Sequence, residues 1–161
     1  MRKFTKIVSV LLLAAALGAL LGACGSAAKK DVPVAELTDA VSRAISADPE
    51  KMVDPGENYV HGYLKKTADE IGEYAIRKTA VGTSIDEFGI FKAGKLTTAE
   101  LKTAIEGYLQ ILRDSWMNYQ PEEKPKLDGA EIRVVGDYVI YAILSEADRE
   151  AAFAAFEKEL K

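Results

Sequence analysis

The side chains that could do chemistry in this chain are one cysteine, one histidine and many scattered carboxylates. Cys24 is the only cysteine, so an intramolecular disulfide is impossible. A single cysteine in a secreted chain indicates a reactive thiol, a bond between chains or a covalent modification. His61 is the only histidine, and one histidine with one cysteine cannot build a zinc site. We therefore expect no metal ion and no cofactor.

Two patterns leave room for acid–base or metal chemistry. Glu57 and His61 are four residues apart, so a helix would place them on one face as half of a metal site; we expect a solvated helical turn instead. Acidic residues gather at two further places, namely Asp69, Glu70, Glu73, Asp86 and Glu87. Two carboxylates that flank a bond can hydrolyse it, but the plainer expectation is a solvated acidic rim.

Other catalytic signatures are missing from the sequence. Gly82 and Gly89 are too far apart for a phosphate-binding loop, and no Gly-Lys-Ser or Gly-Lys-Thr follows them. A serine hydrolase would have to use His61, and there is no Gly-x-Ser-x-Gly turn to present its serine. We therefore assign no catalytic residue.

Cys24 follows a segment with the three zones of a secretory signal peptide. Arg2, Lys3 and Lys6 form a basic start, and residues 7–21 are uncharged and mostly apolar. This run of 15 residues is shorter than the roughly 20 that a transmembrane helix needs. An uncleaved anchor and an ordinary secreted form remain the alternatives.

The four residues that end this segment, Leu21-Gly22-Ala23-Cys24, resemble the lipobox of bacterial lipoproteins. The resemblance implies that Cys24 receives a diacylglyceryl group and becomes the new N-terminus. Two or more acyl chains anchor a protein firmly. We therefore expect residues 1–23 to be a signal peptide, 24–33 a lipidated tether and 34–161 one domain on the extracytoplasmic face of the cell membrane, with membrane lipid as the partner of Cys24.

The charge of the mature chain excludes one class of partner. Residues 1–23 carry three basic and no acidic side chains, so the formal charge of −4 becomes −7 over residues 24–161. A nucleic-acid-binding domain typically carries a basic stripe, and this chain is acidic, so we expect no nucleic acid as partner. The acidic balance also indicates that lipid, not electrostatic attraction, does the anchoring.

Hydrophobic spacing predicts helices at both ends and in the middle of the domain. An amphipathic helix is expected over about 34–47, with turn chemistry at Asp54-Pro55-Gly56. Short helical turns follow near 59–64 and 68–71. The longest helix should run from the capping box Thr97-Thr98-Ala99-Glu100 to about Tyr119, and a last one should start after Ser145. The two prolines of 121–126 predict a loop.

Four strands are expected between these helices. Tyr74–Val81 and Phe88–Lys92 form one pair, joined by a turn at 82–84. Residues 130–135 and 138–144 flank Gly136-Asp137, which suits a type II′ hairpin turn. The resulting fold class is α+β, with an antiparallel sheet of about four strands in two hairpin-like pairs and helices packed mainly on one face.

Aromatic residues offer a weaker hint of binding. Tyr108, Trp116 and Tyr119 lie on or near the apolar stripe of the long helix and should belong to the core. Tyr59 and Tyr63 are one helical turn apart, so they could line a groove, although burial is the more usual fate of such a pair.

The segment Ala80–Lys92, the helix at Thr97, the Gly136-Asp137-Tyr138 hairpin and the closing helix together resemble domain-of-unknown-function family 4358, found in small lipoproteins of Gram-positive bacteria. The resemblance covers most of residues 34–160 and implies an anchored, one-domain protein, but no activity. We expect a non-enzymatic module that binds an extracytoplasmic protein or envelope component. One alternative is an extracellular carboxylate-dependent hydrolase. The other is the solute receptor of a transporter, although such receptors usually have two lobes around a cleft and this chain is small for that architecture.

Overall fold

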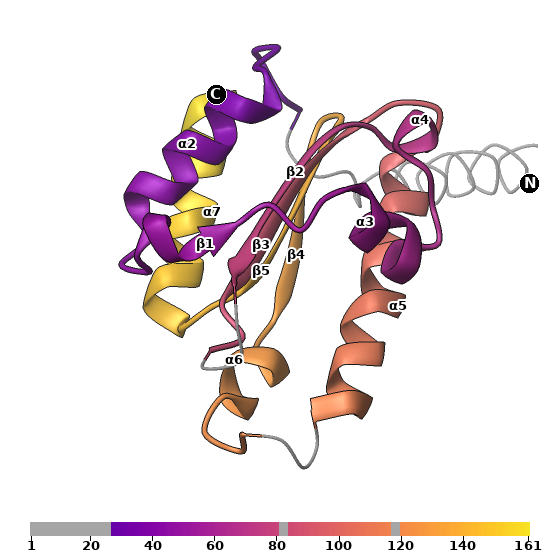
Figure 1. The fold of residues 1–161 in the computed structure, drawn as a ribbon. Helices are drawn as coiled ribbons and strands as arrows, with labels where there is room; N and C mark the ends of the chain where they lie inside the picture. The colour runs from indigo at the N-terminus through magenta and orange to yellow at the C-terminus, as the bar shows by residue number, and fades with distance from the viewer. Residues whose placement is uncertain (1–26, 81–83, 117–119) are drawn as a thin grey trace, which may run out of the picture.

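A five-stranded antiparallel sheet in the order β1-β2-β3-β5-β4 forms the middle of the molecule (Figure 1). The computed structural model describes residues 27–80, 84–116 and 120–161. Within them the strands are β1 (Met52–Val53), β2 (Gly72–Thr79), β3 (Glu87–Ala93), β4 (Glu131–Val135) and β5 (Tyr138–Ile143). The helices are α2 (Val34–Ala44), the 3-10 helix η2 (Pro49–Lys51), α3 (Glu57–Leu64), α4 (Ala68–Ile71), α5 (Thr98–Trp116), α6 (Lys124–Asp128) and α7 (Glu146–Leu160). The α+β class with an antiparallel sheet is confirmed.

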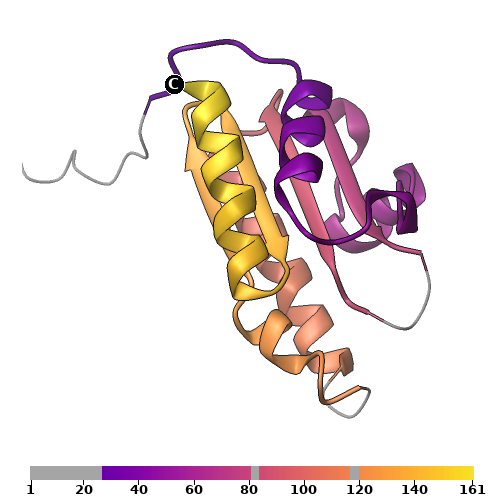
Figure 2. The same cartoon turned by 90° about the vertical axis from the view of Figure 1, so that its left-hand side faces the viewer.

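Helices cover both faces of the sheet, so the expectation that they pack mainly on one face is corrected. Helices α2 and α7 lie side by side on one face (Figure 2), over a core that includes Leu37, Phe153 and Phe156. Helices α3, α4, α5 and α6 cover the other face, where Ile105 and Leu127 are buried. Strand β5 explains the difference, because all six of its residues are buried. A strand covered on both faces reads as a continuous apolar run and not as an alternation.

Local signals in the sequence place several turns and helix ends correctly. Gly136 has a φ of 57° in the two-residue turn between β4 and β5, as a type II′ turn requires. The Thr97 and Glu100 side chains exchange hydrogen bonds with each other's backbone N–H groups, at 3.2 and 2.8 Å. Ser145 Oγ accepts a hydrogen bond from the backbone N–H of Asp148 at 3.2 Å and caps α7.

Two elements differ from the predictions. The segment between α2 and the turn at Asp54-Pro55-Gly56 contains η2 and β1, and β1 is a short fifth strand, beyond the four expected, that pairs with β2. The proline-rich segment contains α6, with Pro125 in its first turn. Proline is tolerated there because the first N–H groups of a helix have no partner within the helix. Tyr119 and the turn residues Gly82 and Thr83 lie outside the described residues.

Candidate functional site

A buried carboxylate surrounded by hydroxyl groups is the most unusual feature of the described residues. Glu87 begins β3 and its side chain is only 2% exposed. We call the group formed by Glu87, Lys78, Tyr59, Tyr108 and Tyr141 the Glu87 cluster. Its members come from β3, β2, α3, α5 and β5. The cluster therefore joins three adjacent strands to α3 and α5, two of the four helices on one face of the sheet.

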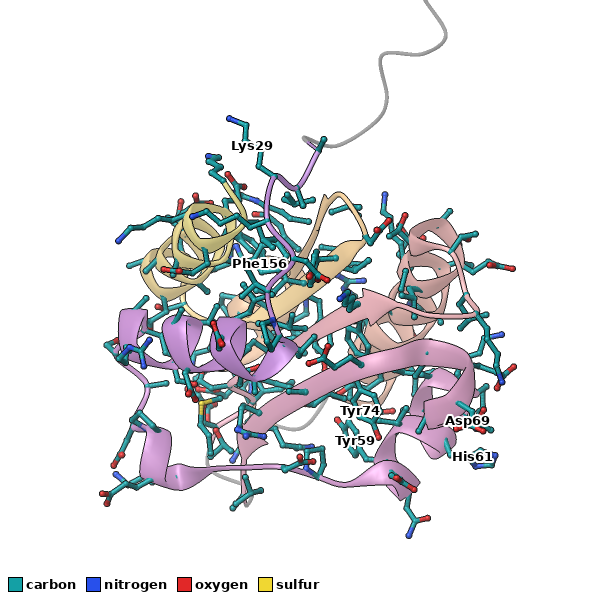
Figure 3. The ribbon with its side chains drawn as sticks, turned by 90° about the horizontal axis from the view of Figure 1, so that it is seen from above. Lys29, Tyr59, His61, Asp69, Tyr74 and Phe156 are labelled. Atoms are coloured by element: carbon teal, nitrogen blue, oxygen red, sulfur yellow. The ribbon has the colours of Figure 1, made fainter. Side chains whose placement is uncertain are left out.

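Strand register brings the sheet members of the cluster together. Glu87 lies directly opposite Lys78 of β2, and Gly89, two residues further along β3, lies opposite Tyr141 of β5. Residues two apart on a strand share a face, so all these positions point towards α3 and α5. Figure 3 shows Tyr59 and Tyr74 on this side of the sheet, and Phe156 on the side covered by α7.

Three phenols donate hydrogen bonds to the Glu87 carboxylate. Tyr141 and Tyr108 donate to Oε1 at 2.5 and 2.8 Å, and Tyr59 donates to Oε2 at 3.0 Å. The hydroxyl groups of Tyr59 and Tyr108 also contact each other. Lys78 Nζ lies 3.7 Å from Oε2 and donates to the Tyr59 hydroxyl at 3.2 Å. The buried charge is thus compensated by hydrogen bonds and by one cation, which is the condition for burying a carboxylate.

Burial dominates the electrostatics of the cluster. It raises the pKa of Glu87 above its usual value, although the hydrogen bond from Tyr141 and the charge of Lys78 oppose the rise. Burial and the neighbouring Glu87 charge also raise the pKa of Tyr59, Tyr108 and Tyr141. The three phenols therefore keep their protons at neutral pH and act as donors to Glu87.

The cluster reaches the surface through tyrosine rings. The Tyr63 ring, 40% exposed, lies 4.7 Å from the Tyr59 ring and 5.5 Å from the Tyr108 ring, measured between centroids. Lys78 Nζ lies 4.4 Å from the centroid of Tyr59, a cation–π contact. Tyr59 is thus half-buried as expected, Tyr108 is part of the core as expected, and Tyr63 is exposed.

Two hollows in the surface of the described residues lie away from Glu87. One, of about 280 Å³, is lined by Lys102, Glu106, Leu109, Arg113, Ala130 and Ile132. The other, of about 300 Å³, is lined by Ala28, Lys29, Lys30, Asp31, Lys92, Asp137 and Tyr138. In the second hollow, hydrogen bonds from Lys92 and Tyr138 lower the pKa of Asp31. A general acid needs a raised pKa, so Asp31 is suited to charge pairing and not to proton donation.

The other acidic candidates have structural partners. Glu70 accepts hydrogen bonds from the backbone and side chain of Thr67, which lower its pKa. Glu73 accepts from the backbone N–H of Val34 at 2.7 Å, and Asp86 pairs with Lys126 at 2.9 Å. Asp69 is exposed. A solvated acidic rim is therefore wrong for Glu87, which is in the core.

Glu57 and His61 both lie on α3 and both are exposed. Within the described residues, no group of three or more histidine, cysteine or carboxylate side chains could hold a metal ion. In that same part of the chain, no helix combines the length and apolar character needed to cross a bilayer. Cys24, the predicted lipidation site, lies outside the described residues.

Sequence reasoning missed the Glu87 cluster because its members are distant in the chain. Glu87 and Tyr141 are separated by 54 positions, and Glu87 and Tyr59 by 28. One local signal exists: Glu87 has the same strand phase as Gly89 and Phe91, and Phe91 is fully buried. That phase predicts an inward-pointing carboxylate.

The family model of a domain of unknown function, DUF4358, matches residues 46–144. The chain belongs to this family, so the resemblance seen in the sequence is confirmed. All five members of the Glu87 cluster lie inside the matched residues, whereas α2 and α7 lie outside them. No curated protein and no solved structure matches the chain.

Proposed function

We propose that the chain is a lipid-anchored extracytoplasmic protein whose domain binds a protein or envelope component and performs no catalysis. The anchor is argued from the leader and from Cys24. The place where the chain enters the domain supports the anchor. The backbone N–H of Lys29 donates to the carbonyl of Leu160 at 2.9 Å, which attaches the incoming chain to the end of α7. From Cys24 to Lys29 an extended chain spans at most about 18 Å. This end of the domain would therefore face the membrane, as would Lys29 at its edge (Figure 3).

The non-catalytic assignment rests on the position of Glu87, a carboxyl group whose pKa is raised. Glu87 has the raised pKa that a general acid needs, but tyrosine rings enclose it and neither hollow described above is lined by it. The hollow that holds two carboxylates, Asp31 and Asp137, contains one whose pKa is lowered. The arrangement supports a rigid scaffold better than a carboxylate-dependent hydrolase.

Fractionation tests the anchor. In cells expressing the full chain, we expect the protein in the membrane fraction and a mass on the N-terminal peptide that corresponds to acylated Cys24. Cys24→Ser should move the protein out of that fraction, whereas the neighbouring change Ser26→Ala should not. Unmodified Cys24 in a protein released to the medium would contradict the anchor.

Chromogenic ester, glycoside and phosphoester substrates test the absence of catalysis. We expect no turnover above that of a heat-denatured sample. Turnover that is lost in Glu87→Gln but kept in Glu106→Gln, a change on the exposed face of α5, would overturn the assignment in favour of the hydrolase.

A further inference from the structure

The edge of the sheet formed by β4 borders the 280 Å³ hollow. Strand β4 is last in the order β1-β2-β3-β5-β4, so among the described residues it has a neighbouring strand on one side only. The hollow lies between this strand, which contributes Ile132, and α5, which contributes Leu109 and Arg113. We call it the α5–β4 groove. A helix beside a free strand edge is a geometry that receives an extended peptide as an additional strand.

Strand register shows which backbone groups the free edge offers. Val135 and Tyr138 face each other across the two-residue turn, and in such a hairpin this pair exchanges hydrogen bonds. The bonded pairs then alternate, so Arg133 with Ile140 is bonded and Val134 with Val139 is not. The N–H and C=O groups of Ile132 and Val134 therefore point away from β5, towards the free edge.

The pairing of β5 with β3 agrees with this register. The backbone N–H of Ala93 donates to the carbonyl of Asp137 at 2.8 Å. The backbone groups of Asp137, Val139 and Tyr141 thus point towards β3. Tyr138 and Ile140 consequently direct theirs to β4, which is the pattern deduced from the hairpin.

The two faces of β4 differ in the side chains they present: charged on the α7 side and apolar on the α5 side. On the α7 side, Arg133 forms ion pairs with Glu150 at 3.2 Å and with Glu157 at 3.3 Å. Arg149 pairs with Glu131 at 3.0 Å beside them. These charges protect that side of the edge against unspecific strand pairing. The half-buried side chains of Ile132 and Val134 lie on the α5 side.

The charged side chains of the groove indicate which side chain a peptide bound there would carry. In the groove, Lys102 Nζ pairs with Glu106 at 3.6 Å. Arg113, two helical turns further along α5, forms no ion pair with another described residue. The domain is acidic as a whole, so the half-buried Arg113 guanidinium at the edge of the groove is a local positive charge that attracts a carboxylate specifically.

We infer that the α5–β4 groove binds an extended peptide segment of a partner protein as a sixth strand on β4. The peptide's backbone bonds Ile132 and Val134, apolar side chains lie against Leu109 and Ile132, and an acidic side chain meets Arg113. This inference rests on the proposed binding function and names its surface and the chemistry of its ligand.

Selection from a phage-displayed random heptapeptide library, with the full chain in detergent as target, tests the inference. We expect selected peptides to alternate apolar and polar residues and to contain an aspartate or glutamate. Val134→Pro removes one outward N–H at an edge position where proline is tolerated, and it should weaken their binding at least tenfold. Arg113→Glu should do the same, whereas Arg43→Glu, the same charge change at an exposed position of α2, should not.

A change in the peptide avoids any effect on folding of the protein. Methylating the backbone nitrogens that would face β4 should abolish binding, and methylating the alternate nitrogens should spare it. In the nuclear magnetic resonance spectrum, the amides of Ile132 and Val134 should shift on binding of the unmethylated peptide.

Three results would overturn the inference. The first is that no peptide is enriched over an uncoated surface, and the second is that selected peptides bind Val134→Pro and Arg113→Glu as well as the unchanged protein. The third is a dimer dissociated by Val134→Pro, which would make a second copy the occupant. The second result leaves the proposed binding function standing at another surface, and loss of membrane attachment in the unchanged protein would refute the anchor alone.

Discussion

The ring of Tyr141 occupies the space that any side chain at Gly89 would need. A β-carbon added to Gly89 would lie 2.3 Å from Cε1 of Tyr141, the residue directly opposite on β5. The absence of a side chain lets the ring lie across β3 and stack on Phe91, with centroids 6.1 Å apart. Its hydroxyl then lies 2.5 Å from the Glu87 carboxylate. Gly89 is therefore part of what positions the Glu87 cluster.

Replacing Gly89 with alanine should destabilise the domain. Because the new methyl group would displace the Tyr141 ring, we expect a loss of about 1–3 kcal/mol in the free energy of unfolding, measured by urea denaturation. Gly107→Ala is the matched control, since a β-carbon there meets nothing within 4 Å. Because position 107 is an exposed position inside α5, this change should stabilise by up to about 1 kcal/mol. Equal stability of Gly89→Ala and the unchanged protein would contradict the role given to Tyr141.

The stability conferred by Glu87 should depend on pH in the direction opposite to that of most carboxylates. Its pKa in the folded protein is raised, so between the unfolded and folded pKa values the folded state binds more protons. The contribution of Glu87 is then full below the unfolded pKa of about 4.3 and is lost as pH rises through the folded pKa. The stability difference between the unchanged protein and Glu87→Gln should therefore decrease with rising pH, as followed by urea denaturation at a series of pH values.

Glu100 supplies a control of opposite sign. Hydrogen bonds from the backbone and side chain of Thr97 lower its pKa, so its contribution is present above the unfolded pKa and is lost as pH falls through the folded pKa. The stability difference between the unchanged protein and Glu100→Gln should thus increase with rising pH. The same slope for both variants would show that Glu87 is not desolvated as described.

Removing one hydroxyl should loosen the segment that leads into α2. Tyr138 Oη accepts a hydrogen bond from the backbone N–H of Val32 at 2.9 Å and donates to Asp31 at 2.7 Å. Tyr138→Phe keeps the buried ring but leaves the Val32 N–H without this acceptor, at a cost of about 1–3 kcal/mol. Hydrogen exchange at Val32 should become faster, while exchange at Ile105 in α5 should change only as much as global stability does. Unchanged exchange at Val32 would show that Tyr138 does not fasten this segment.

The local elements of this fold are largely readable from the sequence, because their causes are local. The capping residues Thr97 and Ser145 mark the beginnings of α5 and α7, and Gly136 marks the hairpin turn. Strand β1 could not be predicted in the same way, since two residues carry no periodic pattern. It is a strand only because β2 presents a free edge to it.

The sequence by itself predicted the lipid anchor at Cys24, which stays a prediction, and it determined the main helices and hairpins and the membership in a family that the comparison confirmed. Only the tertiary structure decided which faces of the sheet are covered and what surrounds Glu87. The physical reason is that hydrophobic periodicity reports whether a residue is inside, but not which distant residue it meets there. The partners of Glu87 come from four other elements, and strand register and helix packing, which are non-local, bring Tyr59, Tyr108 and Tyr141 to the same carboxylate.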